Sequence, residues 1–529
     1  MEEVGAAEDE EEDSVLKNLS NSMKLTIQLI IAILAIQIAF SQGVTDGLIY
    51  SSEAQAGTAR FNALSGAFGA LGGDLSAVSI NPAGSVIFLN SGMAFSLAAN
   101  DTENSASYFN TKTKSVDTDI DFNQAGGVYV FKDESGGVKY TFAFNYQIEK
   151  NYNNELFVRG TGNNSIGDFF LSKAQGIPLN LLQLQNGESI SSLYAYLGAN
   201  EGVTAQNAFL GYQGFIIDPI NPENNEGSDY SSTITPGSFD QEYAYLTQGR
   251  KNKYTLNFGA QVNQRISLGA NINTHSLYFS RSTFLYETNS NPGSFVNKVG
   301  FENNLLVQGY GLSLQLGIIA KVQKNIRLGF SLQTPTWYDM YEETTQFLET
   351  RRVENGQSIV EKINPRVINI FENYRLCTPG ELTASAAYIF GGNGLISFDY
   401  TYKDYGTIRY DSFGSFTDDT YFNSVNNAIK DTFGGVNSLR LGGEYRIHNY
   451  SLRAGFRYED SPSQNKQNIG DLSGFSLGMG YNMGNYNLNI SYVRTEQDRR
   501  QQLYSEGLTD TASIETVTTN IALTLGFIL

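Results

Sequence analysis

Apolar and polar residues alternate with a period of two through most of the chain. Residues 140–147, 254–262, 450–458 and 486–492 each carry an aromatic or aliphatic side chain at every second position, with mostly polar or small residues between them. Successive side chains of a β-strand point to opposite faces. Each of these runs therefore predicts a strand with one apolar face and one polar face.

The connections between these runs are short and long in turn. Tight polar turns join neighbouring runs at residues 133–137, 263–265, 323–325, 391–393, 446–449 and 482–485. Longer polar connections separate the hairpins that these turns make. The sequence predicts fourteen strands, at residues 92–101, 119–132, 138–151, 240–262, 266–288, 299–322, 326–347, 371–390, 395–410, 436–446, 450–459, 470–482, 486–499 and 514–529.

The strand number and the loop lengths together indicate the architecture. An even number of strands, with short turns at one end and long loops at the other, is typical of a bacterial outer-membrane barrel. A secreted β-sandwich or propeller array is the alternative, but such folds bury their apolar faces against a second sheet. Closure also pairs every backbone group inside the lipid. The predicted fold is therefore all-β, a 14-stranded antiparallel transmembrane β-barrel that crosses the outer membrane of a Gram-negative bacterium many times, with its short turns in the periplasm.

The first 41 residues precede the predicted mature protein. Residues 1–22 carry eight acidic side chains and one lysine, and we interpret them as a disordered extension or a start assigned too early. Basic Lys24, an apolar run at 25–40 and a small residue at Ser41 predict a signal peptide over residues 23–41. A transmembrane anchor is the alternative, but a run of about 16 residues is shorter than the roughly 20 that a spanning helix needs.

A segment rich in glycine and alanine follows the signal. Residues 42–85 are small, flexible and nearly uncharged. Such a chain can pack inside a barrel lumen where bulky residues would not fit, so we interpret it as a plug. A periplasmic linker is the alternative. Residues 86–529 then form the barrel itself.

Charge and composition argue against several classes of protein. The chain has 35 basic and 54 acidic side chains, for a net charge of −19, so a nucleic-acid partner is not expected. A lone Cys377 cannot form an internal disulfide, and with only His275 and His448 a zinc site is not expected. The two histidines lie in different predicted hairpins, with no nucleophile indicated beside either. We predict a protein that is not an enzyme and that uses no cofactor or metal.

These features together resemble the FadL-type outer-membrane transporters of long-chain fatty acids and other hydrophobic compounds. Members share a cleaved signal, an N-terminal hatch ending in Asn-Pro-Ala and a fourteen-stranded barrel; here Asn81, Pro82 and Ala83 stand just before the first predicted strand. The resemblance implies a hatch that plugs the lumen and a gating role for these three residues. It also implies a sideways exit at an inward kink of the third strand, although residues 138–152 contain no Gly or Pro that would mark one.

The connection from residue 150 to 239 is far longer than a usual loop and contains many apolar residues. Asn164, Ser165 and Asp168 can cap a short helix, and further amphipathic turns follow. One interpretation is an extracellular groove that draws an apolar ligand from water. The other is a loop that folds its own apolar residues onto the barrel rim. The candidate docking residues are Phe169, Phe170, Leu171, Leu181 and Leu182.

The polar face of the predicted strands offers candidates for binding a charged group. Arg327, Arg453 and Arg457 either hold the carboxylate of a ligand or pair with other charges of the lumen. A short helix is expected near residues 426–431, in the loop at 413–434.

The leading hypothesis for function is passive, ligand-gated uptake of hydrophobic small molecules such as long-chain fatty acids. We expect the barrel to act as a monomer surrounded by outer-membrane lipid, without a cofactor or an energy source. Two alternatives are a FadL-like accessory barrel that carries protein cargo to the cell surface and a surface adhesin.

Overall fold

The computed structural model describes residues 43–132, 139–413 and 420–529. The acidic extension at 1–22, the predicted signal peptide at 23–41 and the predicted turn at 133–137 lie outside these described residues, as does part of the loop at 413–434. Within the described part of the chain, no helix is long and apolar enough to cross a membrane.

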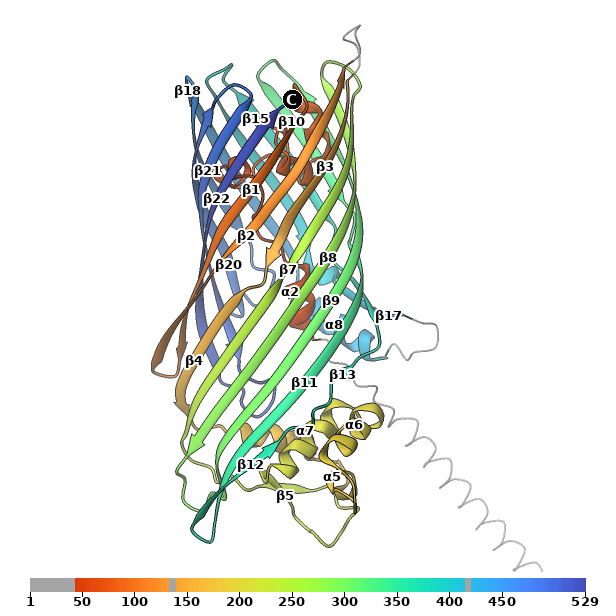
Figure 1. The fold of residues 1–529 in the computed structure, drawn as a ribbon, viewed down its shortest axis with the longest axis vertical. Helices are drawn as coiled ribbons and strands as arrows, with labels where there is room; N and C mark the ends of the chain where they lie inside the picture. Colours follow the sequence, from red (N-terminus) through yellow and green to blue (C-terminus); the bar gives the residue numbers. More distant parts are fainter. Residues whose placement is uncertain (1–42, 133–138, 414–419) are drawn as a thin grey trace, which may run out of the picture.

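Fourteen antiparallel strands close into a barrel, as predicted (Figure 1). The last strand pairs with the first, from Gly92↔Ile528 to Ser107↔Ser513, and this ladder closes the sheet. Some strands are interrupted and carry two labels. In chain order they are β1 (Gly92–Tyr108), β2 (Thr111–Lys132), β3 (Lys139–Asn151) with β4 (Asn154–Gly162), β7 (Phe239–Gln261), β8 (Ile266–Asn289), β9 (Val296–Lys321), β10 (Ile326–Gln333) with β11 (Trp337–Glu354), β14 (Tyr374–Cys377) with β15 (Glu381–Ile389), β16 (Gly394–Asp404) with β17 (Arg409–Ser412), β18 (Gly435–Ile447), β19 (Tyr450–Glu459), β20 (Ile469–Asn482), β21 (Tyr486–Gln502) and β22 (Thr511–Ile528).

The barrel wall has an apolar outer face and a polar inner face. On β7, the side chains of Leu256 and Phe258 are 49% and 57% exposed, whereas Thr255 and Asn257 are each 1% exposed. An outward apolar band is the surface that a hydrocarbon environment requires of a barrel. The alternation predicted from the sequence is thus confirmed, and the polar face lines a lumen.

The third strand is interrupted between β3 and β4. β3 is paired with β2 only from Lys132↔Lys139 to Gln124↔Gln147, whereas β2 stays paired with β1 as far as Tyr108↔Thr111. Among the described residues, β4 forms a backbone ladder with β7 alone. Part of β2 therefore has no backbone ladder on one side, where the side chains of Thr113 and Ser115 donate to β4 carbonyls instead, and the wall has a break in its ladder (Figure 1).

The glycine that permits this break lies on the neighbouring strand. Gly249 of β7 has a φ of +122°, and its carbonyl accepts a hydrogen bond from the Tyr152 N–H at 3.0 Å. A Cβ at Gly249 would lie 2.1 Å from the Tyr278 carbonyl oxygen of β8, so a larger residue does not fit. The third strand is thus interrupted near its middle, although it contains no Gly or Pro to mark the interruption, and the sideways exit implied by the family resemblance stays a prediction.

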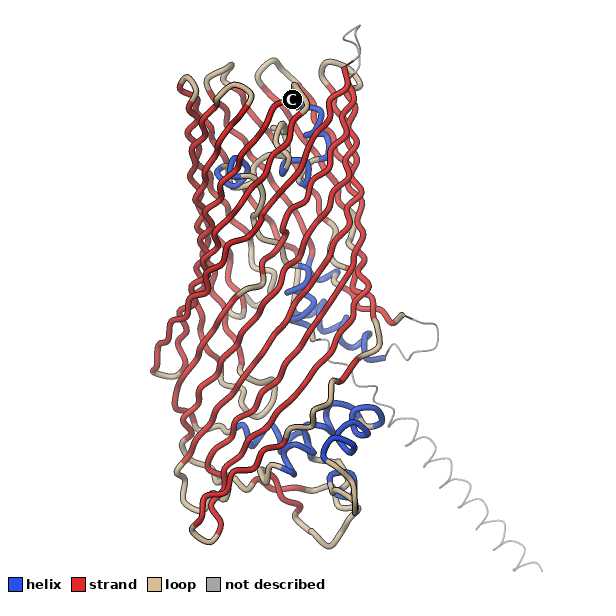
Figure 2. Tube along the Cα trace, in the orientation of Figure 1, coloured by secondary structure: helices blue, strands red, loops and turns tan. Residues whose placement is uncertain are grey.

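The N-terminal segment, residues 43–88, lies inside the barrel (Figure 2). The helix α2 (Val44–Ser51) lies about halfway along the lumen. The short helix α3 (Ala59–Ala63) and the 3₁₀ turns η1 (Ser76–Ser79) and η2 (Pro82–Ile87) follow toward the end that carries the short turns, which we call the short-turn end. Small side chains make this packing possible, and most residues of the segment are buried.

A second helix inserts into the lumen from the opposite end, which we call the loop end. α8 (Thr420–Thr432) packs against α2, and η3 (Tyr405–Thr407) links β16 to β17 beside it. Phe422, Val425 and Ile429 of α8 form one apolar cluster with Leu48 of α2 and the surrounding wall. The helix expected near residues 426–431 is confirmed and is longer than predicted.

The long connection folds into a compact lobe at the loop end (Figure 1). It begins with the strand β4, which was not expected there, and continues through α4 (Ile166–Ala174), α5 (Leu179–Leu182), α6 (Ile190–Asn200), α7 (Gly202–Gln213), β5 (Ile217–Pro219) and β6 (Tyr230–Ser232). The Ser165 side chain caps α4 by accepting from the Gly167 N–H, as its sequence position indicates. β12 (Gln357–Ile363) and β13 (Asn369–Ile370) extend the wall beside the lobe.

Candidate functional site

Asn81, Pro82 and Ala83 lie buried against the wall at the start of η2. Two wall glycines allow this close approach: a Cβ on Gly269 would lie 2.2 Å from the Pro82 carbonyl carbon, and one on Gly317 would lie 2.0 Å from the Asn81 Oδ1. Because packed interiors leave no room for such overlap, any larger residue would displace the segment. The gating role of the three residues stays a prediction.

Polar side chains bind the backbone of the N-terminal segment. The Asn81 Nδ2 donates to the carbonyls of Gly69, at 2.7 Å, and of Ile318 in the wall, at 3.0 Å. The Asp399 carboxylate accepts from the backbone N–H groups of Phe68 and Gly69, both at 2.9 Å. Buried backbone groups need such partners, so the wall specifies where the segment lies.

A buried cluster of charges joins the segment to β18 and β19. The Glu444 side chain is fully buried, and its Oε2 lies 2.9 Å from the Arg60 Nε and 2.7 Å from the Arg453 Nε. Its Oε1 lies 2.6 Å from the Arg446 guanidinium. Arg60 belongs to α3, so this carboxylate fixes the segment to the wall by charge-assisted hydrogen bonds.

Residues 50–54, which we call the strap, connect α2 to the rest of the segment. The Lys251 ammonium donates to the Ser52 carbonyl at 2.9 Å, and the Lys403 ammonium lies 3.0 Å from the Glu53 carboxylate. Burial acts to raise the pKa of the Glu53 carboxyl, but the Lys403 charge outweighs burial and lowers this pKa to about 2. The strap is therefore held by ionic contacts over a wide pH range.

His275 lies in the lumen, in the polar network that supports the strap. Its Nδ1 lies 2.9 Å from the Glu149 carboxylate and its Nε2 lies 3.0 Å from the Ser313 hydroxyl. The Lys253 ammonium is 3.5 Å from the same carboxylate, and the Glu149 carbonyl accepts from the Ala54 N–H at 2.7 Å. Across the described ranges, no group of three or more His, Cys, Asp or Glu side chains could hold a metal ion.

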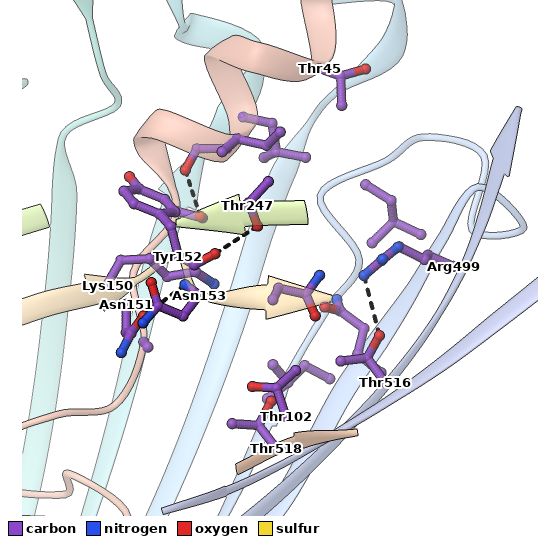
Figure 3. A pocket seen from close by; sticks show the side chains of 18 of the residues that line it. Thr45, Thr102, Lys150, Asn151, Tyr152, Asn153, Thr247, Arg499, Thr516 and Thr518 are labelled. Carbon is purple, nitrogen blue, oxygen red and sulfur yellow. Dashed lines mark hydrogen bonds between the residues drawn. The ribbon is translucent and has the colours of Figure 1, made fainter. Parts of the chain in front are cut away.

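A cavity of about 890 Å³, which we call the chamber, lies on the loop-end side of the strap (Figure 3). It is bounded by α2, the strap and the inner faces of β1, β2, β21 and β22. One side is apolar, because Leu48, Ile49, Tyr152 and Phe279 pack together there. The facing wall carries hydroxyl, amide and guanidinium groups, so the chamber has two chemically different sides.

The chamber reaches the break in the barrel wall. Asn151 lines it at the end of β3, and its Nδ2 donates to carboxylate oxygens of Asp119, at 2.7 Å, and Asp121, at 2.6 Å, both on β2. Arg250 of β7 lies 3.7 Å from the Asp121 carboxylate. Side-chain contacts replace the backbone ladder here, and they can open without breaking a strand.

The three arginines expected on the polar face are all engaged by the protein. Arg327 donates to the Leu71 carbonyl at 2.8 Å, Arg453 belongs to the Glu444 cluster, and Arg457 lies 2.7 Å from the Glu459 carboxylate. Of these, only Arg457 lines the chamber. Arg453 and Arg457 thus pair with other charges, which was the alternative to ligand binding, whereas Arg327 contacts a backbone carbonyl.

Four other cations line the chamber and were not among the residues expected from the sequence: Lys150, Arg281, Arg499 and Arg500. Arg499 shares the polar face of β21 with Ser491, so the alternation contained a signal for it. Lys150 falls on the predicted apolar face, but the register of β3 against β7 shifts between Ile148 and Lys150 and changes the direction of the chain there.

The five candidate docking residues lie in the lobe. Phe170 and Leu182 have no exposed surface and Phe169 is 7% exposed, while Leu171 and Leu181 pack against the same core. The Phe169 ring also lies 6.0 Å from that of Phe301 on β9. These side chains fold the lobe onto the barrel rim, which was the alternative to an open docking groove.

Comparisons with known proteins agree with this architecture at the level of fold. No family model and no curated protein matches the sequence. A Pseudomonas aeruginosa FadL homologue aligns over 90% of this chain and 99% of its own, with 11% identity and a TM-score of 0.51. The P. putida toluene transporter TodX aligns over 90% of this chain and 99% of its own, with 12% identity and a TM-score of 0.49. The monoaromatic hydrocarbon channel CymD aligns over 90% of this chain and 98% of its own, with 12% identity and a TM-score of 0.44. The likeness to the FadL homologue shows that this chain has a FadL-type barrel fold.

Proposed function

We propose that the protein is an outer-membrane channel for the passive uptake of hydrophobic and amphipathic compounds, fatty acids among them. The observation that carries this proposal is the chamber, which has an apolar side and adjoins a break in the barrel wall. A compound would enter from the loop end, outside the cell, and the short-turn end would face the periplasm. Burial of its apolar part against α2 would supply the binding energy, at about 25 cal/mol per Å².

The N-terminal segment supports a sideways exit rather than a straight path through the lumen. Between the chamber and the short-turn end the lumen holds the strap, α3, η1 and η2, and the wall binds them at many points. Side-chain contacts alone close the wall at the break: Asn151 of β3 donates to two β2 carboxylates, and Thr113 and Ser115 of β2 donate to carbonyls of β4. We propose that the ligand leaves there, and that Asn81, Pro82 and Ala83 keep the lumen closed to other solutes.

A two-residue deletion tests this path. Removing Tyr152 and Asn153 would join β3 to β4 without changing which side chains face the lumen, since the side-chain period of a strand is two. We expect the deletion to abolish uptake of radiolabelled oleate by Gram-negative cells that lack their own fatty-acid channel. The matched control deletes Asn224 and Asn225 from the exposed loop of the lobe.

The outcomes separate the two parts of the proposal. Each variant must first show the heat-dependent gel mobility of a folded barrel. Wild-type protein that gives no more uptake than empty vector would refute the channel itself. A folded deletion variant with full uptake would refute the sideways exit and leave the channel standing.

A further inference from the structure

The chamber has the opposite charge balance to the chain as a whole. The chain carries a net charge of −19, yet basic side chains outnumber carboxylates among the residues that line the chamber. The basic residues are Lys150, Arg281, Arg457, Arg499 and Arg500, and the acidic ones are Glu53, Asp119 and Asp121. Positive charge gathered in one cavity of an acidic protein favours an anion there.

Three of these cations have no carboxylate partner within the described residues, and one of the three, Arg500, donates to the Gln467 amide oxygen at 3.0 Å. Arg281 and Arg457 each lie beside a carboxylate, at 2.8 and 2.7 Å. Of the other two, the Arg499 side chain donates only to the Thr516 hydroxyl, at 3.2 Å, and the Lys150 ammonium makes no hydrogen bond to a described residue. They lie on two sides of the chamber, on β21 and β3 (Figure 3). A charge withdrawn from bulk water is costly when unpaired, so a bound anion would stabilise both.

A row of hydroxyl groups crosses the wall beside Arg499. Thr102, Thr518 and Thr495 are register neighbours on β1, β22 and β21, and all three line the chamber. None of them makes a side-chain hydrogen bond to another described residue. A threonine hydroxyl both donates and accepts, so the row can bind hydroxyl groups of a ligand, whereas an alkyl chain would leave it unsatisfied.

From these positions we infer that the chamber binds the head group of an anionic amphiphile whose head also carries hydroxyl groups. Lys150 and Arg499 contact the anion, the threonine row contacts the hydroxyls, and the apolar side formed by Leu48 and Phe279 contacts the alkyl chain. This inference rests on the proposed function, because it names the class of compound that the channel takes. It distinguishes that class from bare hydrocarbons and from simple fatty acids.

Four soluble probes separate the contributions of charge, hydroxyls and chain. They are hexyl glucuronide, hexyl glucoside without the charge, hexanoate without the hydroxyls, and glucuronate without the chain. The purified protein in lipid nanodiscs is titrated with each by calorimetry. We expect hexyl glucuronide to bind at least about tenfold more tightly than the other three, since each of them lacks the charge-assisted hydrogen bonds, the hydroxyl contacts or the apolar contacts.

Variants assign each contribution to its residues. Lys150→Met and Arg499→Gln should each weaken the binding of hexyl glucuronide by about tenfold and leave the binding of hexyl glucoside unchanged. Arg499→Lys, which keeps the charge, should restore most of the affinity for hexyl glucuronide. Thr518→Val should weaken the binding of hexyl glucuronide and of hexyl glucoside but not the binding of hexanoate. The matched controls are Arg494→Gln, whose partner Glu496 lies on the outer surface, and Thr519→Val, which faces away from the lumen; neither should change binding.

Two results would overturn the inference. One is hexyl glucoside or hexanoate binding as tightly as hexyl glucuronide. The other is folded Lys150→Met and Arg499→Gln variants that bind hexyl glucuronide like the wild type. Neither result would contradict the proposed uptake of hydrophobic compounds. If glucuronate binds as tightly as its hexyl glycoside, the apolar side contributes nothing, and the proposed uptake of hydrophobic compounds fails while the anion contacts stand.

Discussion

Replacing Glu444 by Gln should release the N-terminal segment from the wall. The substitution keeps the shape of the side chain but leaves Arg60 and Arg453 next to one another without their shared carboxylate. Removing one member of a buried ion cluster costs about 3–5 kcal/mol, because the remaining charges are unpaired. If the seated state bears this cost, the population of the released segment rises by a factor between about one hundred and several thousand.

Ion conductance in planar lipid bilayers measures that release directly. Wild-type protein should be closed, and Glu444→Gln should show frequent openings. The double variant Arg60→Met with Glu444→Gln removes the repelled charge from the segment and should be open less often than the single variant. Glu496→Gln breaks an exposed ion pair on β21 and serves as the control. A closed Glu444→Gln channel, or a double variant as open as the single one, would refute this reasoning.

Three further perturbations test other contacts. Gly317→Ala places a methyl group 2.0 Å from the Asn81 Oδ1. The overlap should cost about 1–3 kcal/mol of folding free energy and lower the temperature of the gel-mobility shift. The control Gly392→Ala, where the added methyl group meets no atom within 4 Å, should leave that temperature unchanged. Asn151→Ala removes two of the side-chain hydrogen bonds across the wall break. It should speed ligand release in a stopped-flow assay by about tenfold, since hydrogen bonds to carboxylates are lost. An unchanged rate would argue against that exit. The lowered pKa of Glu53 means that the strap keeps its full stabilisation above about pH 4.5 and loses it as the pH falls toward 2. Conductance should therefore rise as the pH falls from about 4.5 toward 2, and a Glu53→Gln variant should lack this dependence.

Local alternation predicts the strands well because lipid and lumen impose opposite requirements on neighbouring residues. The outward position of Phe258 and the inward position of Asn257 follow from this pattern alone. The interruption of the third strand does not follow, because it depends on Gly249, a residue of another strand that lies beside it only after pairing. Alternation also assigns Lys150 to the wrong face, since the register shift occurs at that point.

The chamber could be predicted only in part. Arg499 has the parity of the inward residues of its strand, so a lumen position was readable from the sequence. The row of Thr102, Thr495 and Thr518 was not, since these residues become neighbours only through the closing ladder and its register. The same holds in the lobe. The sequence predicts the helix cap at Ser165, but it does not predict whether Phe170 faces a ligand or a core, because that depends on which residues pack over it.

The pairing of the first and last strands has a consequence for the order of assembly. β22 is the final element of the chain, and until it pairs with β1 the sheet has two open edges. The segment that fills the lumen leads directly into β1, so the seam forms beside the point where this segment joins the sheet. Such a contact, between the two ends of the sequence, is the slowest kind for a chain to make. The eighteen residues of β22 therefore decide whether the sheet closes around the N-terminal segment or offers an open edge to another molecule.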